Sequence, residues 1–141
     1  MNIQQVTTKE QLEDAFTVRR TVFVDEQQVP EEEEIDQFED EATHIVLYDE
    51  NIPVGAARIR VIDGIGKLER ICVLSSARNK GAGKLLVNKL EEIALAEGVS
   101  KFKLNAQTHA IPFYERLGYE TVSDVFLDAG IPHVTMVKQH S

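Results

Sequence analysis

Residues 71–90 read ICVLSSARNKGAGKLLVNKL, and this stretch decides the fold. It begins with four apolar residues, 71–74, which favour a β-strand. A polar turn that contains two glycines follows, and after it apolar residues recur three and four positions apart, which is the spacing of an amphipathic helix. The first turn of a helix has free N–H groups and a partial positive charge. Strand, turn and helix together therefore predict an anion site, with phosphate as the natural ligand.

The residues of the turn support a phosphate ligand. Gly81 and Gly83 lack a Cβ atom, so that a phosphate can approach the backbone closely. Arg78, Lys80 and Lys84 add positive charge around the same point. The sequence therefore places a cationic, glycine-containing turn directly before the helix.

Two common phosphate-binding patterns do not fit this turn. A P-loop requires Ser or Thr after its lysine, where this chain has Leu85, and a dinucleotide fingerprint requires a third glycine, where it has Leu86. The pattern that remains, Arg-x-x-Gly-x-Gly after a strand, resembles the acetyl-CoA signature of the GNAT N-acetyltransferase superfamily. The resemblance implies that acetyl-CoA is the cosubstrate and that it is bound by Arg78, Asn79, Lys80, Gly81, Ala82, Gly83 and Lys84.

Length and composition limit the class of protein. A chain of 141 residues is expected to form one domain, 1–141. The net charge of −9 argues against a nucleic-acid partner, and no apolar run approaches the ~20 residues of a membrane span. A single cysteine, Cys72, and the lack of a signal-peptide pattern favour the cytoplasm. No cluster of His, Cys and carboxylate residues has metal-ligand spacing, so no metal is expected.

The order of predicted elements indicates an α/β protein with a mixed sheet. It resembles the GNAT acyl-CoA N-acyltransferase fold over the whole chain, and the resemblance implies a central sheet flanked by helices and splayed between its fourth and fifth strands, where acyl-CoA enters. An acidic segment, EEEEIDQFEDE at 31–41, holds eight carboxylates and no base and is predicted to be a solvated loop. Strands are predicted at 1–6, 43–48, 52–61, 67–74, 101–106, 119–126 and 131–138, and helical segments at 9–20, 22–27, after the glycine turn up to about 97, and 111–117.

A second resemblance lies at 113–119, FYERLGY, which is similar to the GNAT signature Phe-Tyr-x-x-x-Gly-(Phe/Tyr). The resemblance implies that Tyr114 lies near the sulfur of CoA and protonates the departing thiolate. A thiol has a pKa of about 8.5 and a phenol of about 10, so this proton transfer is feasible. The alternative is that Tyr114 packs as a buried aromatic residue.

A third resemblance lies at 19–27, RRTVFVDEQ, which is similar to an Arg-x-x-Val-Phe-x-x-(Glu/Arg) segment of a GNAT subgroup and of acyl-homoserine-lactone synthases. In that subgroup a carboxylate-rich segment and a Thr-His pair follow, as the acidic segment and Thr43-His44 do here. The resemblance implies that Phe23, Glu26 and His44 lie on the acceptor side of the site. The synthase alternative is the weaker one, because the glycine signature has the acetyltransferase form.

Further site residues are predicted along the central strands. The attacking amine must lose a proton, and Glu69 is the candidate base; the alternative is that Glu69 forms an ion pair with Arg58 or Arg70. The backbone of Ile71, Cys72 and Val73 is expected to pair with the pantetheine amides as an added strand would. Asn105 and Gln107, which end the fifth strand, are expected to bind the pantetheine arm by their side chains.

These observations predict an acyl-CoA-dependent N-acetyltransferase that acts on a primary amine. The acidic segment would concentrate cations, so a small, cationic amine is the expected acceptor. The family resemblance also makes a homodimer possible, and neither nucleic acid nor membrane is an expected partner. Two alternatives remain: a CoA-binding sensor or interaction protein without turnover, and an acyltransferase similar to the homoserine-lactone synthases.

Overall fold

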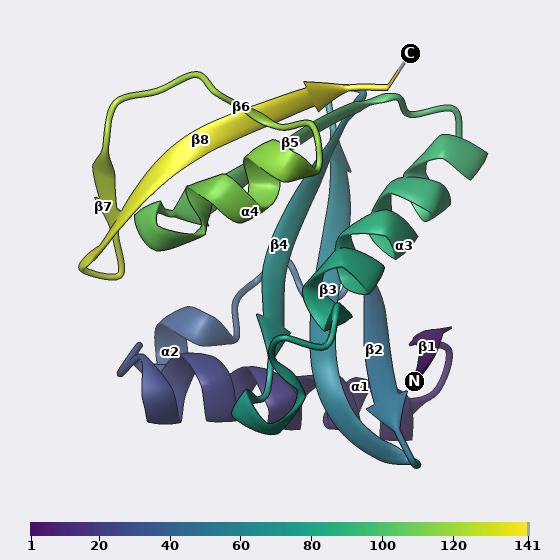
Figure 1. The fold of residues 1–141 in the computed structure, drawn as a ribbon. Coiled ribbons are helices and arrows are strands. Elements are labelled where there is room, and N and C mark those ends of the chain that lie inside the picture. Colours follow the sequence, from purple (N-terminus) through teal and green to yellow (C-terminus); the bar gives the residue numbers. More distant parts are fainter. Residues whose placement is uncertain (141) are drawn as a thin grey trace.

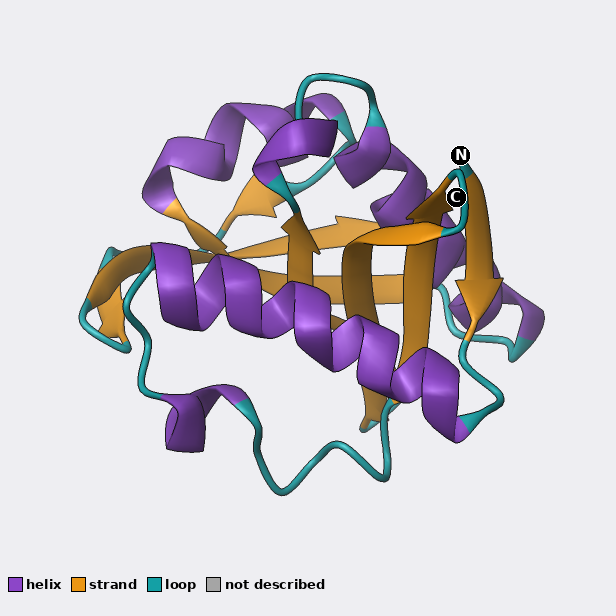
Figure 2. Cartoon of the chain, turned by 90° about the horizontal axis from the view of Figure 1, so that it is seen from below, coloured by secondary structure: helices purple, strands orange, loops and turns teal. Residues whose placement is uncertain are grey.

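The computed structural model describes residues 1–140 and contains one mixed β-sheet with helices on both faces (Figures 1 and 2). The strand order is β1-β2-β3-β4-β5-β8-β6, and β7 also pairs with β8. Only β4 and β5 run parallel among the strand pairs of the described residues. The strands are β1 Asn2–Gln5, β2 Thr43–Asp49, β3 Ile52–Ile62, β4 Ile65–Val73, β5 Lys101–Gln107, β6 Glu120–Thr121, β7 Phe126–Asp128 and β8 Ile131–Gln139.

The helices divide the hydrophobic core between the two faces of the sheet. Successive residues of a strand point to opposite faces, and in β2 the side chains of Ile45 and Leu47 join one cluster while Val46 joins the other. Helices α3 and α4 pack on the first face, and α1 and η1 on the second. The α-helices are α1 Lys9–Arg19, α2 Glu31–Glu34, α3 Ala82–Ala96 and α4 Ile111–Arg116; η1, Arg20–Glu26, is a π-helix, and Ser75–Ala77 and Thr108–Ala110 are 3₁₀ turns.

The predicted splay of the sheet is confirmed. Strands β4 and β5 pair in parallel from Ile65 opposite Lys101 to Leu68 opposite Leu104, and the pairing ends there although both strands continue. A β-bulge lies just beyond this point, because Arg58 of β3 is opposite Glu69 while Ala56 is opposite Cys72. A bulge bends its strand. In consequence β4 and β5 diverge, and residues 69–73 of β4 have a strand partner on one side only.

The predicted strand at 119–126 is corrected by the structure. It consists of two short pieces, β6 and β7, that both pair with β8. Between them the Oγ atom of Ser123 accepts a hydrogen bond from the backbone N–H of Thr135 at 2.8 Å. This side chain takes the place of a backbone carbonyl in the ladder, so the chain bends away from β8 over the intervening residues.

The prediction that the acidic segment is a solvated loop is wrong. The segment begins with the short helix α2, and at least five of its eight carboxylates form ion pairs with arginines. Arg19 is 1% exposed and bonds Glu34 and Glu39 at 2.7 Å each. Arg58, also 1% exposed, bonds Asp36 and Glu39 at 2.8 Å each. Arginines of α1, β3 and β4 therefore hold the segment against the sheet.

Arg19→Ala is expected to destabilise the protein strongly, because it removes the nearest counter-charge of the buried Glu34 and one of the two buried arginines that pair with Glu39. Loss of one partner of a buried ion pair typically costs about 3–5 kcal/mol. Arg20→Ala is the matched control: Arg20 pairs with Glu31 at the surface, where both side chains are about half exposed or more, and such pairs contribute less than about 1 kcal/mol. Urea unfolding measures both free energies. Equal losses in the two variants would contradict the structural role of Arg19.

Candidate active site

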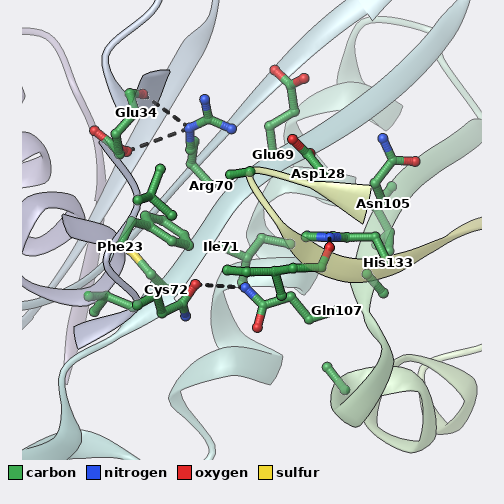
Figure 3. A pocket seen from close by; sticks show the side chains of 18 of the residues that line it. Phe23, Glu34, Glu69, Arg70, Ile71, Cys72, Asn105, Gln107, Asp128 and His133 are labelled. Carbon is green, nitrogen blue, oxygen red and sulfur yellow. Dashed lines mark hydrogen bonds and ion pairs between the residues drawn. The ribbon is translucent and has the colours of Figure 1, made fainter. Parts of the chain in front are cut away.

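The divergence of β4 and β5 opens a cleft of about 890 Å³. Its walls come from β4, β5, the end of η1, the acidic segment and the turn between β7 and β8 (Figure 3). This volume lies within the range of about 300–1,000 Å³ that is typical of small-molecule sites. The cleft contains half of the residues that the sequence proposed for the cofactor, and two of the three proposed for the acceptor; residues 79–84 are not part of its lining.

The glycine turn adjoins the cleft and leads into α3. Gly81 is the N-cap residue of α3 with φ of +78°, and no side chain of residues 1–140 caps this helix start. Its neighbours Lys80 and Lys84 are exposed, and Asn79 also has a positive φ, +66°. The free N–H groups of the first turn and the two lysines form an open, positively charged helix N-terminus. This geometry suits an anion, as the sequence predicted.

The two glycines of the turn have different roles. A Cβ atom on Gly81 would have no atom of the described chain within 4 Å, so this position needs glycine for its backbone conformation. A Cβ atom on Gly83 would lie 3.1 Å from Cζ of Phe113. The expectation that both glycines leave room for a phosphate therefore needs correction: Gly83 allows α3 to pack closely against α4.

Arg78, the first residue of the signature, crosses to the opposite wall of the cleft. Its Nε donates a hydrogen bond to the carbonyl oxygen of Val73 at 2.9 Å. One terminal nitrogen donates to both carboxylate oxygens of Glu26, at 2.9 and 3.0 Å. A residue predicted to bind the cofactor is thus paired with a residue predicted to bind the acceptor.

Tyr114 lies in α4 and lines the cleft, as its predicted role requires. The residue is 8% exposed, and within residues 1–140 its hydroxyl group has no hydrogen-bond partner. Burial, and to a lesser degree the nearby Cys72, raises the pKa of the Tyr114 hydroxyl. The phenol therefore stays protonated and is available as a hydrogen-bond donor inside the cleft. The rings of Phe113 and Tyr119 pack edge-on against it.

Glu69 also lines the cleft, but cations surround its carboxylate. It lies 3.0 Å from Arg58, 2.8 Å from Arg60 and 3.1 Å from Lys67. Burial alone would raise the pKa of Glu69, but the hydrogen bond from Arg60 and the charges of Arg58 and Lys67 outweigh it and lower the pKa to about 2. Such a carboxylate is a weak base. The structure thus shows the ion-pair alternative with Arg58, and the base role of Glu69 stays a prediction.

Of the remaining predicted cofactor residues, Ile71, Cys72 and Val73 line the cleft along β4, whereas Ala82 is buried in the hydrophobic core. Cys72 is 4% exposed and burial raises its pKa to about 12, so it is an inert thiol, as expected of a core residue. On β5, the side-chain oxygen of Asn105 accepts a hydrogen bond from Thr135 at 2.9 Å. The Nε2 group of Gln107 donates to the side-chain oxygen of Gln27 at 2.7 Å, across the cleft (Figure 3).

Of the predicted acceptor residues, Phe23 and Glu26 line the cleft and His44 points elsewhere. His44 is 6% exposed, and its Nε2 lies 2.9 Å from the carbonyl oxygen of Glu39 in the acidic segment. Its ring packs edge-on against Phe16. The structure therefore corrects the expectation for His44: its side chain contacts the acidic segment and Phe16 of α1 and does not line the cleft.

Asp128 and His133 are among the cleft residues that sequence analysis did not assign to the site, whereas Glu32 and Glu33 belong to the acidic segment that it expected to attract a cationic acceptor. Asp128 ends β7 and His133 lies on β8, where it stacks on Phe126. The sequence showed the turn at 128–130, but not that the hairpin folds back over the cleft. Among the described residues, the side chains of Glu32, Glu33 and Asp128 form no ion pair. They leave uncompensated negative charge at the cleft.

Comparisons with known proteins agree with this geometry. The model of the acetyltransferase (GNAT) domain family matches residues 4–140. An uncharacterized N-acetyltransferase of Bacillus subtilis, YjcF, is 58% identical over 131 residues, which are 92% of this chain and 94% of that protein. The chain therefore belongs to the GNAT acetyltransferase family.

Solved structures show the same fold. An acyl-CoA N-acyltransferase from Pseudomonas aeruginosa superposes with a TM-score of 0.88 at 24% identity, over 98% of this chain and 99% of that one. An aminoglycoside 6′-N-acetyltransferase complexed with coenzyme A superposes with a TM-score of 0.80 at 20% identity, over 99% and 97%. The GNAT fold, with its mixed sheet flanked by helices, is thereby confirmed.

No helix within residues 1–140 is long and apolar enough to span a membrane. The same residues contain no group of three or more His, Cys, Asp or Glu side chains placed to hold a metal ion.

Gly81→Val is expected to weaken acetyl-CoA binding at least tenfold, an effect of about 1.4 kcal/mol. A β-branched residue disfavours the positive φ of this position, so the turn must change shape. Gly98→Val is the matched control, since Gly98 ends the same helix with φ of +84° and an equally open Cβ position. Calorimetry on both folded variants measures the affinity. Equal affinity in the two variants would contradict an anion site at Gly81.

Proposed function

We propose that this protein transfers the acetyl group of acetyl-CoA to a primary amine of a small, cationic acceptor. The observation that carries the proposal is the cleft between β4 and β5, which is lined by Tyr114 and by Arg78, the residue that begins the glycine turn before the open N-terminus of α3. Membership of the GNAT family and the coenzyme A complex of a protein with the same fold support it. The proposal treats residues 1–141 as one catalytic domain.

The unpaired edge of β4 has the groups that the cosubstrate needs. Residues 69–73 lack a partner on the side of β5, so their backbone N–H and C=O groups can pair with the amides of the pantetheine arm. Arg70, inside the bulge, has φ of +58°, an uncommon conformation for a residue with a side chain. Such backbone conformations cluster at functional sites. In the proposed reaction, N–H groups at the bulge polarise the thioester carbonyl.

Proton transfers accompany the reaction. We propose that the acceptor ammonium first gives one proton to bulk water, which leaves a neutral amine to attack the thioester. The hydroxyl group of Tyr114, kept protonated by burial, donates to the sulfur when the thioester bond breaks, and the nitrogen of the new amide returns a proton to Tyr114. Glu69, whose pKa is about 2, is a weak base for these transfers.

The charge of the cleft supports a cationic acceptor. Glu32 and Glu33 are exposed on α2, and Asp128 is exposed at the end of β7. These carboxylates differ from the buried, arginine-paired members of the acidic segment such as Glu34, because they remain available to a ligand. Uncompensated negative charge in a cleft raises the local concentration of cations and their rate of association.

Free CoA release from acetyl-CoA is expected with at least one class of amine among polyamines, amino sugars and peptide N-termini. Tyr114→Phe, which keeps the ring and removes the proton, should lower turnover by about 10²-fold or more while the affinity for acetyl-CoA changes little. A thiol-release assay and calorimetry measure the two quantities. If the protein binds acetyl-CoA but releases no free CoA with any of these amines, the sensor alternative is favoured. If wild type and Tyr114→Phe turn over equally, Tyr114 is excluded as the proton donor.

Glu32→Gln/Glu33→Gln is expected to raise the KM for a cationic acceptor about three- to tenfold and to flatten the salt dependence of kcat/KM, since exposed charges act weakly and are screened by salt. The affinity for acetyl-CoA should stay nearly constant. Asp40→Asn/Glu50→Gln, which removes the same charge from exposed positions away from the cleft, is the control. A KM and salt response equal to those of the control would exclude the two glutamates from acceptor binding.

A further inference from the structure

Two consecutive residues at the end of η1 reach across the cleft. The carboxylate of Glu26 accepts two hydrogen bonds from Arg78, at 2.9 and 3.0 Å. The side-chain oxygen of Gln27 accepts one from Nε2 of Gln107, at 2.7 Å. All four residues line the cleft, and the dashed line at Gln107 in Figure 3 marks the second contact. The contacts therefore join η1 to the glycine turn at one point and to β5 at the other.

Arg78 and Gln107, the donors of these contacts, are residues that sequence analysis predicted to bind the cofactor. Arg78 begins the phosphate-binding turn, and Gln107 ends the strand that faces the pantetheine arm. A carboxylate presents two anionic oxygens to a guanidinium as a phosphate does. The side-chain carbonyl oxygen of glutamine accepts hydrogen bonds as an amide carbonyl oxygen of pantetheine does. Glu26 and Gln27 thus offer the chemistry of the two parts of the cofactor, in the same order along the cleft.

We propose that Glu26 and Gln27 are internal substitutes for the cofactor: they occupy Arg78 and Gln107 in the free protein, and acetyl-CoA must displace them to bind. The proposal rests on acetyl-CoA binding in this cleft. In this proposal Glu26 controls the affinity for the cofactor. The sequence resemblance had implied a different role, contact with the acceptor.

The surroundings of the two residues allow them to be displaced. The side chains of Arg78 and Glu26 are 42% and 36% exposed, so water can replace each partner when the pair opens. Glu26 is the last residue of a π-helix and Gln27 is its C-cap residue; this rare form of helix occurs frequently at functional sites. The chain then turns at Gln28, which has φ of +63°. The backbone of the segment stays hydrogen-bonded, so displacement requires only that the two side chains move.

Competition of this kind lowers the apparent affinity for the cofactor. When only a fraction of the molecules is open, the apparent Kd equals the intrinsic Kd divided by that fraction. An exposed ion pair favours the closed form weakly, by about two- to fivefold. Removal of the internal competitor should therefore tighten binding by about this factor, whereas removal of a residue that contacts the cofactor would weaken it.

Calorimetric titration with acetyl-CoA tests the proposal in the full chain. Glu26→Gln should bind acetyl-CoA about two- to fivefold more tightly than wild type. Asp25→Asn is the matched control: it removes the same charge from the preceding, exposed residue, which has no side-chain contact to Arg78. An equal gain in both variants would show a general charge effect and overturn the proposal. Unchanged or weaker binding by Glu26→Gln would overturn it too.

A second variant and a second probe separate the two contacts. Gln27→Ala should bind free pantetheine more tightly than wild type, while Glu26→Gln should bind it equally, because pantetheine has no pyrophosphate to compete with Glu26. The reverse pattern would contradict the assignment of the two residues. If neither wild type nor any variant binds acetyl-CoA, the proposed function fails and the inference with it. If all bind and the affinities are equal, the inference alone fails.

Discussion

The end of the parallel pairing between β4 and β5 is the constraint on which the rest of the structure depends. Four residue pairs, from Ile65 and Lys101 to Leu68 and Leu104, join the two halves of the sheet. Beyond them the bulge bends β4, and Arg70 keeps its positive φ while its side chain bonds Asp36 and the carbonyl oxygen of Glu34. Because the strands separate here, backbone N–H and C=O groups of β4 that would form hydrogen bonds to β5 in a regular sheet remain available to a ligand.

The acidic segment has two roles that its charge alone did not distinguish. Glu34, Asp36 and Glu39 pair with buried arginines and hold the segment beside β4. Breaking such a pair leaves a buried charge, so these residues stabilise the architecture around the cleft. Glu32 and Glu33 precede Glu34 on α2, but their side chains are exposed and line the cleft. One stretch of carboxylates thus supports the wall of the site and supplies its free negative charge.

Sequence reasoning identified the parts of the site that depend on local chemistry. The glycine turn and the Tyr114 signature were recognised from short motifs and the splayed sheet from the family resemblance; in the structure, Arg78 at the start of the turn and Tyr114 both line the cleft that the splay opens. It failed where a role depends on partners distant in sequence. Asp36 lies 22 positions from Arg58, and Asp128 lies far along the chain from every other wall of the cleft. Charge patterns and turn signals cannot specify such pairings, because they contain no information on tertiary contacts.

The same limit explains the roles of Glu69, His44 and Gly83. Each type of residue was suitable for the predicted role, but three cations surround Glu69, the carbonyl oxygen of Glu39 engages His44, and Phe113 fills the space beside Gly83. A side chain's pKa and accessibility are set by neighbours from several elements. The residue type limits what a position can do, and the fold decides what it does.

Amide hydrogen exchange with and without acetyl-CoA tests the central claim most directly, because the claim concerns backbone groups of β4. The account predicts slower exchange at amides within residues 69–73 and in the first turn of α3 when acetyl-CoA is added. Residues 65–68, already paired with β5, should change little. Bound acetyl-CoA that leaves residues 69–73 unprotected would contradict the account, since the cofactor would then occupy a site other than the gap between β4 and β5.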